Sequence, residues 1–310
     1  MYRYIIKRLF LLIPVILGSA FIIFMIMNIA PGDITDVIAA EADEEAVVEL
    51  KSSLGLDRPL VVQYVEYIGK LFRGDLGRSY YNNNNVFEEF CQRFPNTLQL
   101  AGWGLVVGIL ISIPIGILSA VKQYSIWDNA GMVVALIGVS MPAFWEGLLL
   151  ILLFSLNLGW LPSGGNTMPF AIVLPAVTTG TRMAATITRM TRSSMLEVIR
   201  QDYIYTARAK GLSEKRVIFN HAFRNALIPV ITTAGISFGS SIGGAVVTET
   251  VFSWPGVGKL VVESIGRRDI PMVLGCIVLI TVCICIVNLL VDLLYAFVDP
   301  RIKAQYKKAR

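Results

Sequence analysis

The chain has 310 residues, of which 55% are hydrophobic and 16% are charged, and its mean hydropathy is +0.65. Soluble domains carry about 25% charged residues, so this composition argues against a soluble protein and indicates a lipid environment. The net charge of +5 does not indicate nucleic-acid binding, because the basic residues stand between apolar runs rather than on one polar face.

Six apolar runs are each long enough to cross a hydrocarbon core of roughly 30 Å as a helix. The first is too long for a signal-peptide core and no A-x-A cleavage site follows it, so it predicts a retained span. The fourth is the most polar, because Arg182 and several threonines interrupt it. We therefore predict an all-α membrane protein with six transmembrane helices. They fall at residues 9–30, 97–121, 130–156, 170–190, 227–252 and 272–298.

The segment between the first two runs, residues 31–96, is long and begins with a cluster of acidic residues. Two stretches in it have helical periodicity, one near residues 46–60 and one at residues 58–72, RPLVVQYVEYIGKLF. The asparagines at 82–85 predict a turn or a mobile stretch. We interpret residues 31–96 as a small ordered cap on the outer face, with a solvated loop as the alternative.

Basic residues predict the orientation of the spans, because they mark the cytoplasmic ends of membrane helices. They are most frequent at the N-terminus, in the segment after the fourth run and in the tail at residues 301–310. We therefore expect both termini in the cytoplasm. The predicted parts are a first helix at 1–30, an extracytoplasmic segment at 31–96, a five-helix core at 97–300 and a basic tail at 301–310.

The polar, basic stretch at residues 197–226 differs from the rest of the chain. We expect residues 193–205 to continue the fourth helix outward and residues 206–210 to form a short helical piece. Gly211 permits a left-handed turn, and Ser213 is expected to cap a second helix. A helix–glycine–helix element between two spans can act as a lever, and its basic residues suit an acidic groove. The alternative is a charged loop that only follows the positive-inside rule.

A family resemblance rests on residues 206–232, TARAKGLSEKRVIFNHAFRNALIPVIT. This stretch resembles the coupling segment of ABC importer permeases of the dipeptide, oligopeptide and nickel family. The general importer motif is E-A-A, three residues, glycine, nine residues, then I-x-L-P. Gly211 and Ala207 fit its glycine and second alanine, whereas the residues at its first two positions and at the I, L and P positions depart from it. Those departures, Tyr205, Thr206, His221, Phe223 and Arg224, are similar to the peptide subfamily's version, except that Tyr205 replaces an arginine.

Further motifs follow the family's order along nearly the whole chain and resemble its first, B-type permease. They are IIKRLFLLIPVILG with APGD, GDLGRS, RFPNTLQLA, SMPAFWEGLLLILLF, LGWLPSGG, TRMTRSSMLEV and NLLVDLLYAFVDPRI. The resemblance implies a type I ABC importer permease fold in a bacterial or archaeal cell (inner) membrane, with peptides as cargo. It also implies a second, non-identical permease, two cytoplasmic ATPase subunits and an extracytoplasmic substrate-binding protein.

The resemblance implies which residues contact the ATPases. They are Tyr205, Thr206, Ala207, Arg208, Ala209, Lys210, Gly211, Leu212, His221 and Arg224. We expect His221 to hold a fixed hydrogen bond there rather than to sense pH. The chain has no G-x-x-x-x-G-K-[ST] loop, so it is expected to bind no cofactor itself and to leave ATP and Mg²⁺ to the ATPases.

Ionisable residues inside the predicted spans are candidates for the translocation path, because such groups face a cavity or a partner. Glu146 and Arg182 lie at similar predicted depths and are expected to pair or to line the path. Glu249 and Asp292 are further candidates, at an outer gate and on a packing face of the last span. The small residues at 237–247, SFGSSIGGAVV, predict either a contact with the second permease or a pore-lining turn.

Three alternatives remain open or are disfavoured by the residues. The same assembly with nickel chelates or another small solute as cargo stays open, as does a proton-coupled secondary transporter. An intramembrane enzyme is disfavoured, because the chain has neither H-E-x-x-H nor G-x-S-x-G. A metal site is not predicted, since one histidine cannot form a histidine-based zinc centre.

Overall fold

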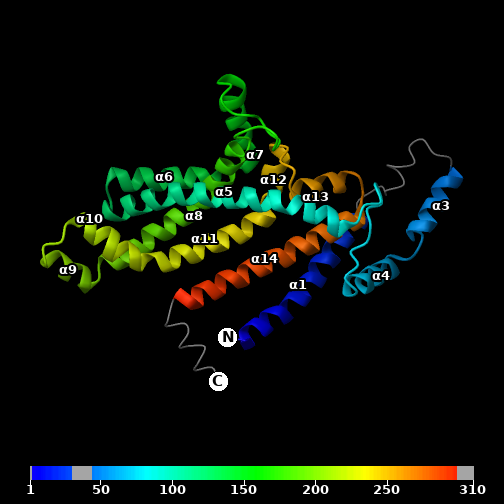
Figure 1. The fold of residues 1–310 in the computed structure, drawn as a ribbon, viewed down its shortest axis with the longest axis horizontal. Coiled ribbons are helices and arrows are strands. Elements are labelled where there is room, and N and C mark those ends of the chain that lie inside the picture. Colours follow the sequence, from blue (N-terminus) through cyan, green and yellow to red (C-terminus); the bar gives the residue numbers. More distant parts are fainter. Residues whose placement is uncertain (1, 30–43, 299–310) are drawn as a thin grey trace. The chain divides into compact units, whose positions relative to one another are not determined.

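The computed structural model describes residues 2–29 and 44–298, and the described residues form helices joined by loops (Figure 1). The acidic start of the segment predicted at 31–96 and the tail predicted at 301–310 lie outside them. The helices of the first part of the chain are α1 (Tyr2–Ile29), α3 (Glu44–Leu54), α4 (Leu60–Phe72), α5 (Val86–Val121), α6 (Ile126–Ser140), α7 (Ala143–Leu150) and the π-helix η1 (Ile151–Asn157). They are followed by α8 (Val173–Ile199), α9 (Asp202–Ala209), α10 (Glu214–Arg216), the π-helix η2 (Val217–Phe223), α11 (Arg224–Gly244), α12 (Val246–Val251), α13 (Val257–Gly266) and α14 (Ile270–Val298).

Four helical stretches of the described chain are long and apolar enough to cross a membrane. They are Phe10–Ile29, Val86–Val121, Glu214–Gly244 and Ile270–Leu293. The pair formed by α6 and by α7 with η1 makes a fifth if it is one span. The all-helical membrane fold is therefore confirmed, while only five of the six predicted spans meet this standard.

The predicted fourth span is the 27-residue helix α8, which is too polar to meet the standard for a span. Many of its residues are buried against α6, α7 and α11, so neighbouring helices rather than lipid surround much of it. Two of its buried threonines bond to the preceding turn: Thr178 Oγ1 donates to the Leu174 carbonyl at 3.0 Å, and Thr191 Oγ1 donates to the Ile187 carbonyl at 2.8 Å. A helix shielded in this way can carry polar residues at membrane depth.

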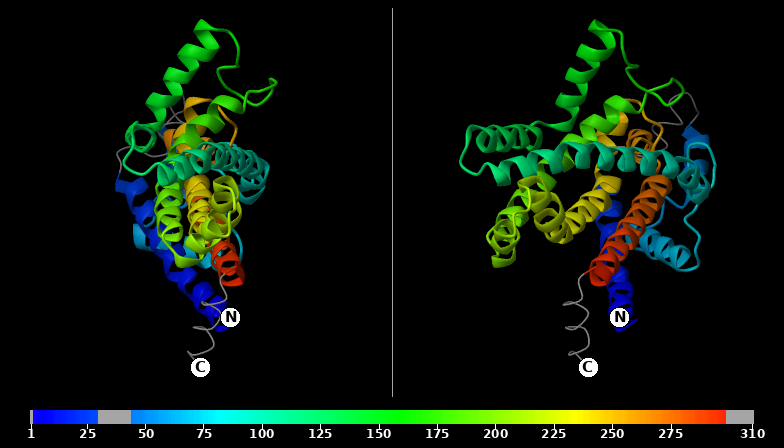
Figure 2. Two further views of the ribbon diagram at one scale, coloured as in Figure 1. Left: turned by 90° about the vertical axis from the view of Figure 1, so that its left-hand side faces the viewer. Right: turned by 60° about the vertical axis from the view of Figure 1, so that its left-hand side comes forward.

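The predicted third span is not one straight helix. It bends by 103° between α6 and α7, and α7 with η1 leaves the direction of α6 sharply in Figure 2. Pro142 causes the break: the residue before a proline avoids helical angles, and Met141 has φ −79° and ψ 127°.

Contacts divide the chain into two compact units, the first formed by residues 1–97 and 255–285. Its core joins α1, the first turns of α5, α13 and α14, with Val86, Val257 and Val273 fully buried. Gly275 allows α14 to approach α5 closely, because a Cβ there would lie 2.4 Å from a side-chain carbon of Val86. The asparagine-rich stretch forms an ordered turn, anchored where the buried Asp269 carboxylate accepts from the Ser79 hydroxyl and the Tyr80 N–H.

The second unit comprises residues 98–254 and 286–310, and α8 packs against α5, α6 and α11 within it. Glycines bring α5 and α8 together: a Cβ on Gly180 would lie 2.8 Å from the Gly104 carbonyl oxygen. On α11, Gly235 lies against Val291 of α14 in the same manner. Close helix approach through small residues is typical of membrane helices.

Several predicted boundaries are wrong. The second predicted span starts at Val86, well before residue 97, and the fifth is divided into α11 and α12. The fourth does not continue to residue 205, because α8 ends at Ile199 and α9 begins at Asp202. The amphipathic helix α4 is confirmed, whereas α13 is too short for a span and was not predicted.

Candidate functional site

The segment predicted to couple to the ATPases consists of α9, the turn at Gly211, α10 and η2. Gln201 has an extended ψ of 148°, which separates α9 from α8. Gly211 has φ +77°, a left-handed conformation that other residues adopt only at a cost. The predicted turn and the helix start at Glu214 are confirmed, although Ser213 makes no side-chain capping hydrogen bond.

One face of α9 is docked on the ends of neighbouring helices. Ile204 is 0% exposed and Ala207 is 6% exposed. They pack in a cluster with residues of α5, α8, η2 and α11, among them Ile117, Met195 and Val217. The segment is therefore part of the folded core of the second unit, and a displacement of α9 has to move these helix ends with it.

The other face of α9 and the turn that follows it are open. Among the residues predicted to contact the ATPases, Ala207 is buried, Arg208, Leu212 and His221 are half-buried, and Tyr205, Thr206, Ala209, Lys210, Gly211 and Arg224 are exposed. Tyr205 is 57% exposed. A large exposed aromatic residue beside cationic groups is typical of protein interfaces.

Polar contacts also connect the short helices of this segment. Arg208 Nε donates to Glu214 Oε1 at 2.7 Å across the Gly211 turn, and its Nη2 donates to Oε2 at 3.3 Å. Because both side chains are partly exposed, this pair adds at most about 1 kcal/mol. Asn225 Nδ2 donates to the Tyr203 hydroxyl at 2.9 Å and so connects α11 to α9.

The fixed hydrogen bond expected at His221 is not made by its ring to any described residue. Its carbonyl accepts from Asn225 Nδ2 at 2.8 Å. It lies in η2, whose π-helical turn was not predicted. Such turns often occur at functional sites.

A groove of about 370 Å³ lies within the second unit, between α7, α8, α11 and α12. We call it the hydroxyl groove, because six of its side chains carry hydroxyl groups. These are Thr179, Thr186, Ser237, Ser240, Ser241 and Thr248. Arg182 contributes the only charge among its lining residues. The serines come from the small-residue stretch at 237–247, so part of that stretch lines a groove.

Of the four residues predicted for the translocation path, only Arg182 lines this groove. Glu146 accepts a hydrogen bond of 2.6 Å from the Thr181 hydroxyl, and no ion pair joins it to Arg182 among the described residues. Its second oxygen is buried without a hydrogen-bond partner in the described part of the chain. Glu249 is fully buried on α12, and Asp292 is half-buried on α14.

An ion pair with a buried carboxylate joins α6 and α8 and was not predicted. Arg192 donates from Nε and Nη2 to the two oxygens of Asp128, both at 2.7 Å, and Asp128 is 2% exposed. Ser125 caps α6 by accepting from the Asp128 N–H at 3.3 Å. This S-x-x-D pattern is a helix-start signal, and it was missed because the third span was expected to begin at residue 130.

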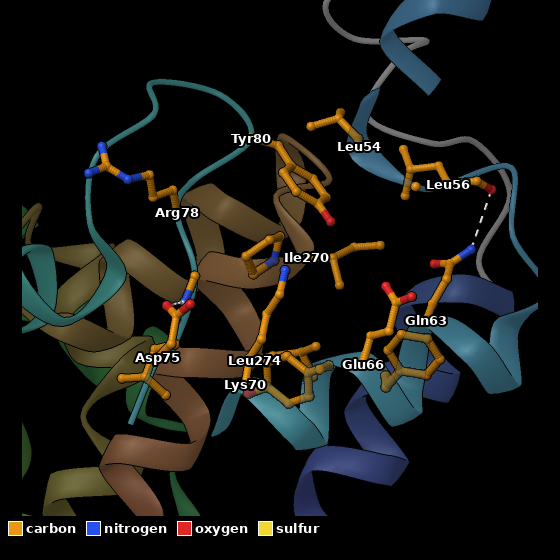
Figure 3. A pocket seen from close by; sticks show the side chains of 16 residues that line it. Leu54, Leu56, Gln63, Glu66, Lys70, Asp75, Arg78, Tyr80, Ile270 and Leu274 are labelled. Atoms are coloured by element: carbon orange, nitrogen blue, oxygen red, sulfur yellow. Dashed lines mark hydrogen bonds between the residues drawn. The ribbon is translucent and has the colours of Figure 1, made fainter. Parts of the chain in front are cut away.

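The first unit contains a smaller pocket, of about 130 Å³, beside α4. Figure 3 shows Glu66, Lys70 and Tyr80 directed toward a common space. Glu66 is engaged by Arg58 in an ion pair. With Asp75 and Arg78 also in its lining, the pocket carries both signs of charge and favours no single ion.

Comparison with known families connects these features. The profile described as "Binding-protein-dependent transport system inner membrane component" matches residues 112–304, and the profile of the corresponding N-terminal region matches residues 1–101. The chain belongs to this family. It is therefore the membrane component of an ABC transport system, a multi-pass inner-membrane protein that serves transport rather than catalysis.

The similarity to relatives extends over nearly the full length of this permease. The chain is 42% identical to the di/tripeptide transport system permease protein DppB of Pseudomonas aeruginosa, with 98% of this chain and 100% of the relative covered. The oligopeptide transport system permease protein AppB of Bacillus subtilis is 44% identical with the same coverage. The glutathione transport system permease protein GsiC of Salmonella choleraesuis is 41% identical, over 98% of this chain and 99% of the relative.

The fold also matches solved permeases. An inward-facing structure of the MetNI methionine ABC transporter aligns with a TM-score of 0.59 at 20% identity, over 69% of this chain and 97% of that chain. This likeness confirms the ABC importer permease fold.

Proposed function

We propose that this chain is one of two permease subunits of an ATP-driven importer, and that its cargo is di- and oligopeptides. The observation that carries the proposal is α9, which is anchored by Ile204 and Ala207 and open at Tyr205 and Thr206. The peptide cargo is supported by the full-length similarity to permeases named for di/tripeptide and oligopeptide transport.

In the proposed mechanism, two ATPase subunits hold the open face of α9 and its counterpart on the second permease. ATP and Mg²⁺ bind to those subunits. When they close, the displaced α9 carries the ends of α5, α8 and α11 with it, because the cluster around Ile204 is a packed core. An extracytoplasmic binding protein delivers the cargo, and both termini of this chain lie in the cytoplasm.

The test is uptake of a labelled dipeptide by proteoliposomes that contain the complete transporter with its binding protein. We expect uptake to require ATP and this chain, and unlabelled dipeptides to compete. Uptake that persists without ATP would support a secondary transporter instead. Competition by a nickel chelate with no competition by dipeptides would overturn the proposed cargo.

A further inference from the structure

The hydroxyl groove holds a cation whose hydrogen-bond donors are not used by the described chain. Arg182 is exposed and makes no hydrogen bond and no direct ion pair with any residue that the structure describes, although its charge acts on Glu146 through space. Arginine at membrane depth is costly unless it meets a counter-charge or water. Its planar guanidinium matches a carboxylate with two parallel hydrogen bonds. No carboxylate of the described chain makes this two-hydrogen-bond contact with Arg182, so its donors are available to another anion.

A second, independent group in the groove also lacks its partner. Thr179 is 7% exposed, and its Oγ1 is buried without a hydrogen-bond partner among the described residues. Thr179 and Arg182 lie three residues apart on α8, so they occupy neighbouring positions on one helix face. Buried hydroxyls are normally satisfied, and this one lines the same groove as the free guanidinium.

The carboxylate on the neighbouring helix α7 does not fill this role. Glu146 is bound to the hydroxyl of Thr181 and is not among the residues that line the groove. The rest of the polar lining, including Ser237 and Ser240, consists of hydroxyl groups, which can donate to an anion. The lining thus offers one positive charge and several donors, and no negative charge.

We propose that the hydroxyl groove is an anion site on the translocation path, where Arg182 and Thr179 bind the carboxylate of the cargo. The inference rests on the proposed function, since a peptide in solution carries a carboxylate at its C-terminus. The volume of about 370 Å³ falls within the range of roughly 300–1,000 Å³ for small-molecule sites. A carboxylate of the second permease is the other source of such a group, and the experiment below separates the two.

The first measurement probes the charge of the groove. The complete transporter carries this chain with its four native cysteines replaced and with the substitution Ser240→Cys. Thiol modification is followed with an anionic sulfonate reagent and a cationic trimethylammonium reagent, in the nucleotide-free and the vanadate-trapped states. We expect Arg182→Gln to lower the anionic-to-cationic rate ratio by at least about fivefold in the accessible state.

The matched control is Arg189→Gln, which removes the same charge from the same helix two turns away and outside the groove. It should leave the ratio almost unchanged. An equal effect of both substitutions, or no effect of Arg182→Gln, overturns the anion site. If the thiol introduced at position 240 reacts with neither reagent in either state, the groove is filled by the second permease, which also overturns the site.

The second measurement identifies the ligand. Alanyl-alanine should slow the modification of the introduced thiol by about threefold at twice its dissociation constant, as simple competition requires. Alanyl-alanine amide, which has no carboxylate, should not protect, and Arg182→Gln should remove the protection by the free peptide. Equal protection by both peptides, or by neither, overturns carboxylate recognition. Failure of the proposed function is seen separately, as dipeptide uptake that does not need this chain.

Discussion

The coupling segment and the hydroxyl groove belong to the same unit but differ in whether their polar side chains are hydrogen-bonded within the chain. In the coupling segment, Arg208 bonds to Glu214 and Asn225 bonds to Tyr203, so the exposed surface has a fixed shape. In the groove, the guanidinium of Arg182 and the hydroxyl of Thr179 make no hydrogen bond with the described chain. The first arrangement suits a permanent protein partner, and the second suits a ligand that binds reversibly.

The two regions also differ in what lies beneath them. Below the coupling segment is an apolar cluster centred on Ile204 and Val217, which transmits force because it cannot deform without loss of packing. Around the groove, glycines such as Gly104 and Gly180 allow close helix contact with little side-chain volume. We infer that both properties serve transport. The rigid cluster below the coupling segment passes on the movement imposed by the ATPases, and the small, polar contacts around the groove allow the helices there to shift.

The largest expected effect comes from the turn. Gly211→Pro cannot adopt φ +77°, since proline fixes φ near −65°, and it also removes the N–H that donates to the Arg208 carbonyl at 2.9 Å. We expect the variant to insert and assemble, but to lose peptide uptake by at least about tenfold, equivalent to about 1.4 kcal/mol. ATP hydrolysis and uptake are measured on the same proteoliposomes.

Gly211→Asn is its matched control, because asparagine tolerates the left-handed conformation better than other residues. It should keep most of the uptake. Equal uptake by Gly211→Pro and the unsubstituted chain would show that the turn has no mechanical role.

The next effect concerns the anchor of α9. Ile204→Ala should lower the free energy of unfolding by about 2–5 kcal/mol and Ile204→Val by about 0.5–1.5 kcal/mol, because Ile204 is fully buried in the cluster. We expect the number of peptides imported per ATP to fall in the same order. Thermal unfolding of the purified complex gives the stability change, and an unchanged coupling ratio in Ile204→Ala would argue against transmission through this cluster.

A substitution in the groove should have a smaller effect on stability, and of the opposite sign. Thr179→Val keeps the shape that packs against Gly104 and removes a hydroxyl with no partner, so stability should stay equal or rise by about 1 kcal/mol. Protection of the thiol introduced at position 240 by alanyl-alanine should weaken in the same variant. Thr179→Ser should retain that protection, and a loss of stability in Thr179→Val would mean that the hydroxyl has an important partner.

The smallest effect should come from the ion pair on the surface. Arg208→Gln with Glu214→Gln should change the stability by less than about 1 kcal/mol, because the pair is partly exposed. A double-mutant cycle in thermal unfolding measures it. A coupling energy well above that limit would show that the pair, rather than the core below α9, fixes the segment.

Local pattern was sufficient to predict the long helices and the turn, but not the breaks in the helices or the short helix α13. Long apolar runs located α1, α5 and α14, helical periodicity located α4, and the glycine at 211 identified the left-handed residue. The sharp bend before Pro142 was missed, since an apolar run does not reveal a change of direction. Proline within a run was the available signal.

The site was less predictable, because its features depend on contacts between distant residues. The pair of Asp128 with Arg192 joins residues 64 apart in sequence, and depth along a span cannot specify such a partner. The same limit applies to Glu146, which accepts its hydrogen bond from Thr181 and interacts with Arg182 only through space. The polarity of α8 is explained by the packing of α6 and α11 against it, and these contacts are not visible in its own sequence.

The most direct test of the account is the accessibility of the open face of α9 in the assembled transporter. Thr206→Cys is introduced into the chain without native cysteines, and its reaction with a membrane-impermeant thiol reagent is followed from the cytoplasmic side, with and without the ATPase subunits. The account predicts rapid modification of the isolated permease pair and strong protection in the full complex. Equal rates in both would contradict it, because α9 would then be free of the subunits that are proposed to move it.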